Sequence, residues 1–431
     1  MIKKLLLKDS AAAIFSRKEK NLYFLLFFFF FALYMPGIDW LYNVAMWVLF
    51  VYSFFYNNLP EKLALLKQRK AVILLIVFYL LICISALLSK NLGEGISWVG
   101  IRISFLIFPL AIGSIYIGRL LKERILYGFV LATCTAGVLC IVHAGIRAVY
   151  NHDPSLLYND NLSEIINLQS IYFAMLVNLA LFSFSYLYFI KSSLPPKYCW
   201  LFVLGVLLPV HFLLASRIAI IILYGLLFLF AIYTAVYKKK MLQGLALVGL
   251  LAGGAFLLVL VFPKTLNRFK ELGYTKFNYS STARESHFNM ALTPDQWNGA
   301  NLRIAVWGCA WTVAKEHLLL GTGVGDKMDM LKKQYAKKGF AFGIYTNRNV
   351  HNTYLDVWMS LGLIGLILFV SALLILPCIQ CIKTGDWFGL LVITAFCLSL
   401  VSETYIDRTM GNTILSFFLS FMAAYKKPNA A

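Results

Sequence analysis

Residues that could carry chemistry stand at isolated points of a very apolar chain. Arg217 interrupts the run Leu-Leu-Ala-Ser-Arg-Ile-Ala-Ile, while Arg303 and His351 belong to the longest polar segment. Placing an arginine at membrane depth costs about 3 kcal/mol on insertion scales, so a compensating partner is expected. A guanidinium matches a phosphate with two parallel hydrogen bonds, and a histidine can accept a proton near neutral pH. These residue types favour chemistry on a phosphate-bearing substrate. The alternative for Arg217 is a snorkelling side chain at a helix end.

Further polar residues fall on the same predicted side of the chain. The supporting candidates are Asn352, Asp356, Glu403 and Arg408. Arg102 and Arg147 are weaker candidates for contacts to phosphate, because both lie near predicted helix ends, where snorkelling is an alternative explanation.

The composition shows what must position these residues. Hydrophobic residues make up 61% of the 431 residues and charged residues 13%, whereas soluble domains contain about half and a quarter. The net charge of +20 does not indicate nucleic-acid binding, because the basic residues cluster in short loops between apolar stretches. Cys378 and Cys381 form a C-x-x-C without a second Cys or His pair, so neither a metal nor a redox site is expected.

Apolar stretches of about 20 residues predict an all-α polytopic membrane protein with about twelve spans. The predicted spans are 22–38, 40–57, 70–89, 96–117, 124–149, 166–190, 198–215, 218–237, 241–263, 353–377, 385–402 and 409–425. The chain therefore divides into nine N-terminal spans within 1–263, a large polar loop at 264–352, and three C-terminal spans within 353–431.

The distribution of basic residues orients these spans. The segment before the first span is basic and lacks a convincing cleavage site, so we expect a retained first span and a cytoplasmic N-terminus. Groups of basic residues then fall in alternate short loops and at the C-terminus: Lys62, Lys67, Arg69 and Lys70; Arg119, Lys122 and Arg124; Lys191 and Lys197; Lys238, Lys239 and Lys240; Lys383; Lys426 and Lys427. Both termini and these loops are predicted to be cytoplasmic, and the large loop to lie outside.

The large loop has features of its own. From Pro263 to Val350 it holds 13 Lys and Arg against 6 Asp and Glu, an excess that suits a polyanionic substrate or simply a solvated face. Residues 300–320 alternate at helical spacing, which predicts an amphipathic helix lying against the membrane domain or the bilayer surface, with one side formed by Ile304, Trp307, Trp311 and Ala314. The glycines from Gly321 to Gly325 lack the context of a nucleotide loop, so a tight turn is expected.

One spacing motif begins at His351. Nine residues separate His351-Asn352 from Gly362-x-x-Gly365, and eleven positions are almost three helical turns, so Gly362 is expected on the face of His351. The two glycines would let another helix approach closely.

This motif resembles the signature of the O-antigen ligase family. Other stretches also look like that family: Ser216-Arg217, Arg303 with Trp307, the run from His317 to Asp326, and Glu403 with Gly411. The resemblance covers roughly residues 96–425, and the first spans carry no signature. Leu318 stands where the family commonly has proline.

The resemblance implies a GT-C-type glycosyltransferase fold in the inner membrane, with the active site at the periplasmic face. It implies transfer of a glycan from undecaprenyl diphosphate to a sugar hydroxyl of lipid A-core, without a metal or another cofactor. Arg217 and Arg303 would bind the donor diphosphate, and His351 would be the general base. Alternatively, His351 only orients the diphosphate and Glu403 or Asp356 takes the proton.

Two other classes of function compete with this prediction. An O-antigen polymerase or a protein O-oligosaccharyltransferase uses the same lipid-linked donor and differs in the acceptor. A transporter or flippase could hold an anionic lipid with the same arginines, but transporters usually contain internal repeats. The chain has no evident repeat, and its charged residues fall on one predicted side.

Overall fold

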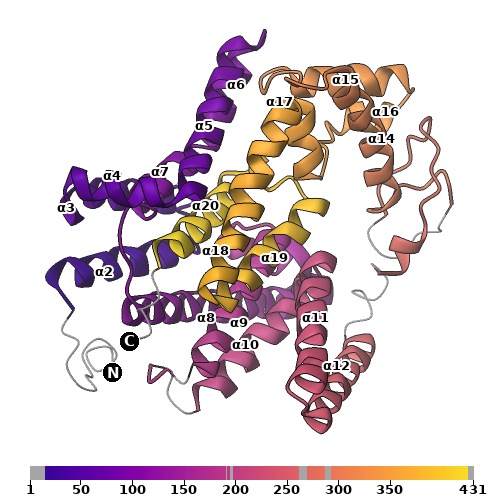
Figure 1. The fold of residues 1–431 in the computed structure, drawn as a ribbon. Helices are drawn as coiled ribbons and strands as arrows, with labels where there is room; N and C mark the ends of the chain where they lie inside the picture. The colour runs from indigo at the N-terminus through magenta and orange to yellow at the C-terminus, as the bar shows by residue number, and fades with distance from the viewer. Residues whose placement is uncertain (1–14, 191, 195–197, 262–268, 287–292, 426–431) are drawn as a thin grey trace.

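The computed structural model describes residues 15–190, 192–194, 198–261, 269–286 and 293–425. All regular elements in these ranges are helices, and Figure 1 shows how they are arranged. Six of them are long and apolar enough to cross a membrane: α5 (Lys70–Leu88), α6 with α7 (Leu92–Ile101 and Ser104–Ala111), α8 (Arg119–Tyr150), α9 (Ser170–Phe189), α11 with its π turn (Arg217–Ile232 and Tyr233–Tyr237), and α17 to α18 (Thr353–Val370 to Leu376–Thr384).

Further helices occupy the other predicted spans. They are α2 (Arg17–Ala32), α3 (Leu41–Tyr56), α10 (Cys199–Leu213), α12 (Met241–Val261), α19 (Trp387–Ser402) and α20 (Thr409–Ala424), and a short α4 (Leu59–Gln68) links α3 to α5. An all-α polytopic membrane protein is thus confirmed for the described part. The number of twelve membrane crossings stays a prediction, because several of these helices are shorter than the roughly 20 residues that a span needs.

Loops that the charge pattern assigns to one side contact one another. On the predicted cytoplasmic side, the Lys122 ammonium lies 3.0 Å from the Asp386 carboxylate, and the Ser192 hydroxyl donates to Glu123 at 2.7 Å. On the other side, the amide of Asn91 donates to the Asp326 carboxylate at 2.9 Å. These contacts join loops that the charge pattern assigns to the same side, and the sides themselves stay a prediction.

Which set faces the cytoplasm is open to a direct test. We expect reporters fused at Lys240, Lys383 and the C-terminus to behave as cytoplasmic, because lysine-rich short loops are retained inside. Alkaline phosphatase inserted at Gly299 should be active, since that enzyme needs the periplasm to form its disulfides. High phosphatase activity at Lys240 would overturn this orientation.

The large loop folds around a small core of its own. It contains α14 (Asn301–Glu316), α15 (Lys327–Lys337) and α16 (Ala341–Tyr345), and Figure 1 shows all three gathered beside one end of α17. The core members are Trp297, Leu302, Ala305, Val306, Cys309, Ala310, Val313, Ala314, Leu331, Tyr335, Phe340, Phe342, Val350, Leu355 and Met359. Leu355 and Met359 belong to α17, so the loop packs directly on a membrane helix.

The predicted helix in the loop is confirmed, and its predicted side meets α17 through Trp311, whose ring centroid lies 4.8 Å from that of Trp358. The buried face of α14 runs through Ala305, Cys309 and Val313, while Ile304 is 38% and Trp311 50% exposed. The apolar stripe read from the sequence lies on the more open side because the loop supplies aromatic partners, including Trp297, for the opposite face. Ala314 is the exception, being fully buried.

The prediction that Gly362 shares a helical face with His351, and that Gly362 and Gly365 let another helix approach closely, is wrong. Gly362 has φ +67° and breaks α17, so it continues no helical face from His351, which precedes the helix. A Cβ on Gly362 would lie 2.1 Å from the Leu319 carbonyl oxygen, and one on Gly365 2.2 Å from the Cβ of Leu361 in its own chain segment. The close neighbour of Gly362 is therefore a loop backbone and not another helix.

Hydrogen bonds from that loop compensate for the break in α17. The amide of Leu363 donates to the Leu318 carbonyl at 2.9 Å, and the amide of Gly323 donates to the Ser360 carbonyl at 3.0 Å. Gly321 and Gly323 both have positive φ, at +72° and +92°, which glycine adopts without steric cost. The tight turn predicted for the glycine run is confirmed, and it pairs with the backbone that the helix break exposes.

Candidate active site

A cavity of about 920 Å³ opens where several predicted outer segments meet. Its lining comes from the segments before α9 and α11, from the large loop, and from the connection between α19 and α20. The charged residues in the lining are Asp160, Arg217, Glu285, Arg303, Arg348, Glu403, Asp407 and Arg408, joined by His351. Helix-forming segments more than 200 residues apart in sequence thus place their polar ends around one space.

Helix N-termini contribute to the electrostatics of this cavity. Gln169, Ser216, Ala300 and Arg408 are the cap residues that precede α9, α11, α14 and α20, and all four line it. An α-helix carries roughly half a positive charge at its N-terminus. Four carboxylates balance the four arginines of the lining, so it is the part of the cavity at Arg217, Arg303 and these helix ends that favours anions. Phosphate groups are typical ligands of such positions.

Arg217 and Arg303 converge on the backbone of Gly299. The Arg303 Nη1 atom donates to the Gly299 carbonyl at 2.7 Å, and its Nε atom to the Ser402 carbonyl at 3.2 Å. A Cβ built on Gly299 would lie 2.3 Å from Arg217 Nη2 and 3.3 Å from Arg303 Nη1. The two predicted phosphate-binding arginines are therefore neighbours, and a side chain at position 299 would have to displace the end of Arg217.

His351 and Glu403 form a hydrogen-bonded pair beside the arginines. His351 Nδ1 lies 3.1 Å from Glu403 Oε1, and the Thr404 amide donates to the same oxygen at 3.2 Å. Burial raises the pKa of Glu403, but the hydrogen bond from His351 and the charges of His351 and Arg303 outweigh it, and the pKa lies below its ordinary value. An ionised carboxylate only accepts hydrogen bonds, so Nδ1 carries the hydrogen and Nε2 is the ring atom that can accept a proton.

The backbone of His351 is held in an uncommon conformation. Its φ is +49°, which costs a non-glycine residue on the order of 1–3 kcal/mol and persists only where the surroundings fix it. The neighbouring Thr353 hydroxyl donates to the Glu403 carbonyl at 2.7 Å and accepts from the Tyr405 amide at 3.1 Å. These contacts hold the chain at His351 and the chain at Glu403 in register.

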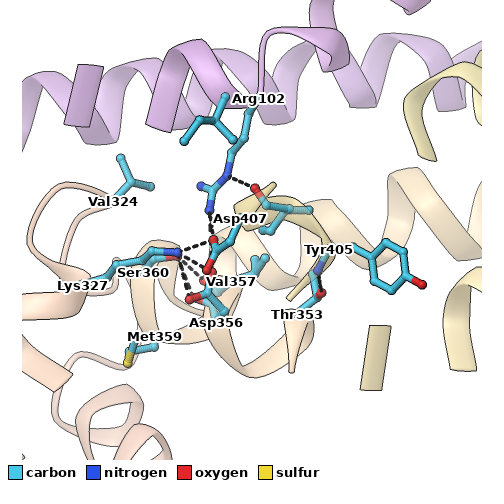
Figure 2. Close-up of polar contacts among 12 residues, drawn as sticks. Arg102, Val324, Lys327, Thr353, Asp356, Val357, Met359, Ser360, Tyr405 and Asp407 are labelled. Atoms are coloured by element: carbon cyan, nitrogen blue, oxygen red, sulfur yellow. Dashed lines mark hydrogen bonds and ion pairs between the residues drawn. The ribbon is translucent and has the colours of Figure 1, made fainter. Parts of the chain in front are cut away.

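Asp356 and Arg102 lie away from the cavity surface in a buried ionic cluster, drawn in Figure 2. The Lys327 ammonium is 2.9 Å from Asp356 and 2.6 Å from Asp407, and the Arg102 guanidinium is 3.1 Å from Asp407. Asp356 is fully buried in these contacts, so its carboxylate does not face the cavity. Arg102 does not snorkel either, because its side chain has no exposed area.

The remaining supporting candidates, Asn352, Arg408 and Arg147, have three different positions. The Asn352 side chain accepts from the Leu355 amide at 3.0 Å and caps the N-terminus of α17. Arg408 lines the cavity, whereas Arg147 pairs with Glu164 outside it.

Several residues of this site were not predicted from the sequence. Gly299, Lys327, Arg348 and Asp407 were missed as residues of the site. Arg348 lies three residues before His351 and pairs with Glu285 across the cavity wall. The signal for Arg348 was its position within the polar run from Thr346 to Asn349, all of which line the cavity. Within the described ranges, no three His, Cys, Asp or Glu side chains are grouped as metal ligands.

The fold and the cavity define a polytopic membrane protein with a polar, arginine-containing pocket between its helix ends and an extramembrane loop. Residues 200–370 match a family model described as O-antigen ligase, so this part of the chain carries the O-antigen ligase family signature. The match contains Arg217, Arg303 and His351, and it confirms the resemblance drawn from the motifs. It supports an enzymatic role on lipid-linked glycans, of the type shared by ligases and polymerases. A search of curated proteins finds no match to the chain.

Proposed function

We propose that this protein is an O-antigen ligase of the bacterial inner membrane with its active site at the periplasmic face. It transfers a glycan from undecaprenyl diphosphate to a sugar hydroxyl of lipid A-core. The observation that carries this proposal is the convergence of Arg217, Arg303 and the His351–Glu403 pair on one cavity. A phosphate-binding corner beside a potential base is what displacement of a diphosphate by a hydroxyl requires.

The arginines would stabilise the leaving group. As the bond between the anomeric carbon and the diphosphate oxygen breaks, negative charge grows on that oxygen. Arg217 and Arg303 would hold the diphosphate through charge-assisted hydrogen bonds, and the N-terminus of α11 adds partial positive charge. Donors positioned where charge develops are usually the largest single contribution to catalysis.

His351 would activate the acceptor. Its Nε2 atom takes the proton of the attacking hydroxyl while the new glycosidic bond forms at the anomeric carbon, and Glu403 stabilises the resulting imidazolium. Undecaprenyl diphosphate leaves from the opposite side, so a single displacement inverts the anomeric configuration. Asp356 is a poor alternative base because Lys327 holds its buried carboxylate. Glu403 is a poorer base than His351 because its lowered pKa weakens its affinity for a proton.

An O-antigen polymerase or a protein O-oligosaccharyltransferase is the second candidate, and it would use the same donor site. The family match favours this whole group over a transporter. These enzymes differ in the acceptor that receives the glycan, so identifying the acceptor distinguishes a ligase from the other two. A strain lacking the protein should show only lipid A-core on a silver-stained lipopolysaccharide gel and should accumulate long lipid-linked glycan. Loss of glycan length with ligation of single units retained would identify a polymerase instead.

We expect transfer by the purified protein to persist in EDTA and to need no ATP. The reason is that guanidinium groups, and no metal ion, would neutralise the diphosphate in this proposal. Transfer would be measured in detergent with and without chelator, and with ATP omitted. Activity that disappears in EDTA and returns with Mg²⁺ or Mn²⁺ would refute the arginine-based account.

A further inference from the structure

The buried ionic cluster joins four separate parts of the chain. Lys327 begins α15 in the large loop, Asp356 lies in α17, Arg102 connects α6 with α7, and Asp407 precedes α20. In Figure 2 their charged ends point toward one another, and the side chains of Arg102, Lys327 and Asp356 are at most 1% exposed. The two cations and two carboxylates balance one another in charge.

The cluster touches the cavity without being part of its open surface. Asp407 lines the cavity although only 6% of its side chain is exposed. Trp98, another lining residue, covers the cations: its ring lies 4.1 Å from Lys327 Nζ and 5.3 Å from Arg102 Cζ. Lys327 and Arg102 therefore do not line the cavity themselves and contact two of its lining residues, Asp407 and Trp98.

Such a cluster is a costly way to gain stability. Removing charges from water carries a large desolvation penalty, and replacing a buried ion pair by apolar residues is often neutral or stabilising. What buried ion pairs can supply is a fixed geometry, because each charge must keep its partners. Here the fixed geometry concerns residues 403–408, a segment that contributes Glu403 and Arg408 to the lining of the cavity.

The contacts along this segment show how the geometry is held. Arg102 Nε donates to the Ile406 carbonyl at 3.1 Å, and its Nη2 atom to Asp407 at 3.1 Å. Asn412 from α20 donates to the same Ile406 carbonyl at 3.0 Å. Lys327 is the only one of these donors that comes from the large loop, and it makes the shortest contact to Asp407, at 2.6 Å.

We propose that Lys327 and Arg102 are positioning residues: through Asp407 they fix segment 403–408, and so hold Glu403 against His351. This proposal rests on the proposed function, in which the His351–Glu403 pair accepts the proton. Because Lys327 belongs to the large loop and the other members to the membrane helices or their connections, the cluster also sets how the loop lies over the cavity. Neither residue contacts the substrate.

The variant Lys327→Met tests the proposal. It should lower turnover by about 100-fold, because misplacing reacting groups by about 1 Å can cost that much. The KM for the lipid-linked donor should change less than turnover, since Arg303 keeps its hydrogen bond to Gly299 and Arg217 lies outside segment 403–408. The matched control is Lys333→Met, an exposed lysine on the same helix, which should leave both constants unchanged.

A second measurement needs no substrate. Hydrogen exchange followed by mass spectrometry should show faster exchange in peptides covering 403–408 for Lys327→Met, with peptides of α14 and α11 unchanged. If the purified wild-type protein transfers no glycan while this local change appears, the proposed function fails and the link from Lys327 to the segment stands. Unchanged exchange at 403–408 would overturn the link itself.

A double variant guards against simple loss of folding. Lys327→Met leaves Asp356 without its nearest cation, so Lys327→Met with Asp356→Asn removes both charges and should restore abundance in the membrane. Asp407 still lacks Lys327 in this protein, and turnover should stay low. Turnover restored to the wild-type value in the double variant would show that Lys327 serves only to neutralise Asp356, and would contradict its positioning role.

Discussion

His351→Ala is expected to lower transfer by about 10²–10⁴-fold, the usual contribution of a general acid or base. Donor binding should be retained, because the imidazole acts on the acceptor hydroxyl and the diphosphate is bound by arginines. Abundance in the membrane should remain near wild type, since His351 precedes α17 and its side chain is 23% exposed. Initial rates at saturating donor, with donor binding measured separately, distinguish a lost base from a lost binding contact.

The chain offers a matched control for this variant. His152 also lies in a predicted outer loop with positive φ, at +52°, and is exposed outside the cavity. His152→Ala should therefore keep full activity despite the same change of residue type and backbone conformation. Substantial transfer by His351→Ala would remove His351 as the base and make Glu403 the next candidate.

Replacing either Arg217 or Arg303 by alanine should weaken donor binding and also lower turnover, by about 10²–10³-fold in turnover. A charge-assisted contact to the diphosphate acts in the ground state and strengthens in the transition state, so both quantities should respond. Arg303 also donates to the Gly299 and Ser402 carbonyls, so its loss should disturb the cavity wall as well. Thermal stability measured beside activity separates these two effects.

Arg217→Lys tests the geometry of the contact. A lysine keeps the charge but cannot form the paired hydrogen bonds of a guanidinium, so little activity should return. Arg147→Ala is the control, because this arginine pairs with Glu164 and does not line the cavity. Near-normal transfer with Arg217→Lys would mean that the position supplies only local positive charge.

Much of this site could be predicted from the sequence because local patterns of apolar and basic residues indicate the membrane topology. Apolar runs fix the spans, basic loops assign their sides, and any polar residue at an outer helix end must then share one face of the membrane. This reasoning brought Arg217, Arg303, His351 and Glu403 together, and the cavity contains all four.

Such local patterns could not predict which residues far apart in the sequence contact each other. The cluster of Arg102, Lys327, Asp356 and Asp407 joins residues up to 305 positions apart, and nothing local marks Lys327 as buried. Likewise, the local pattern around Gly362 predicts an uninterrupted helix. The helix is broken there because hydrogen bonds with the distant Leu318 and Gly323 stabilise the break, and no local pattern indicates them. In both cases the deciding contact comes from another part of the chain.

In the proposed reaction, the glycan is transferred from the lipid diphosphate to lipid A-core within one cavity. The most direct test is reconstitution of the purified protein in liposomes with an undecaprenyl diphosphate-linked glycan and lipid A-core as the only acceptor. We expect lipid A-core to gain the glycan with inverted anomeric configuration, and His351→Ala to form no product. Glycan chains that lengthen on the lipid diphosphate while lipid A-core stays unmodified would contradict the ligase assignment.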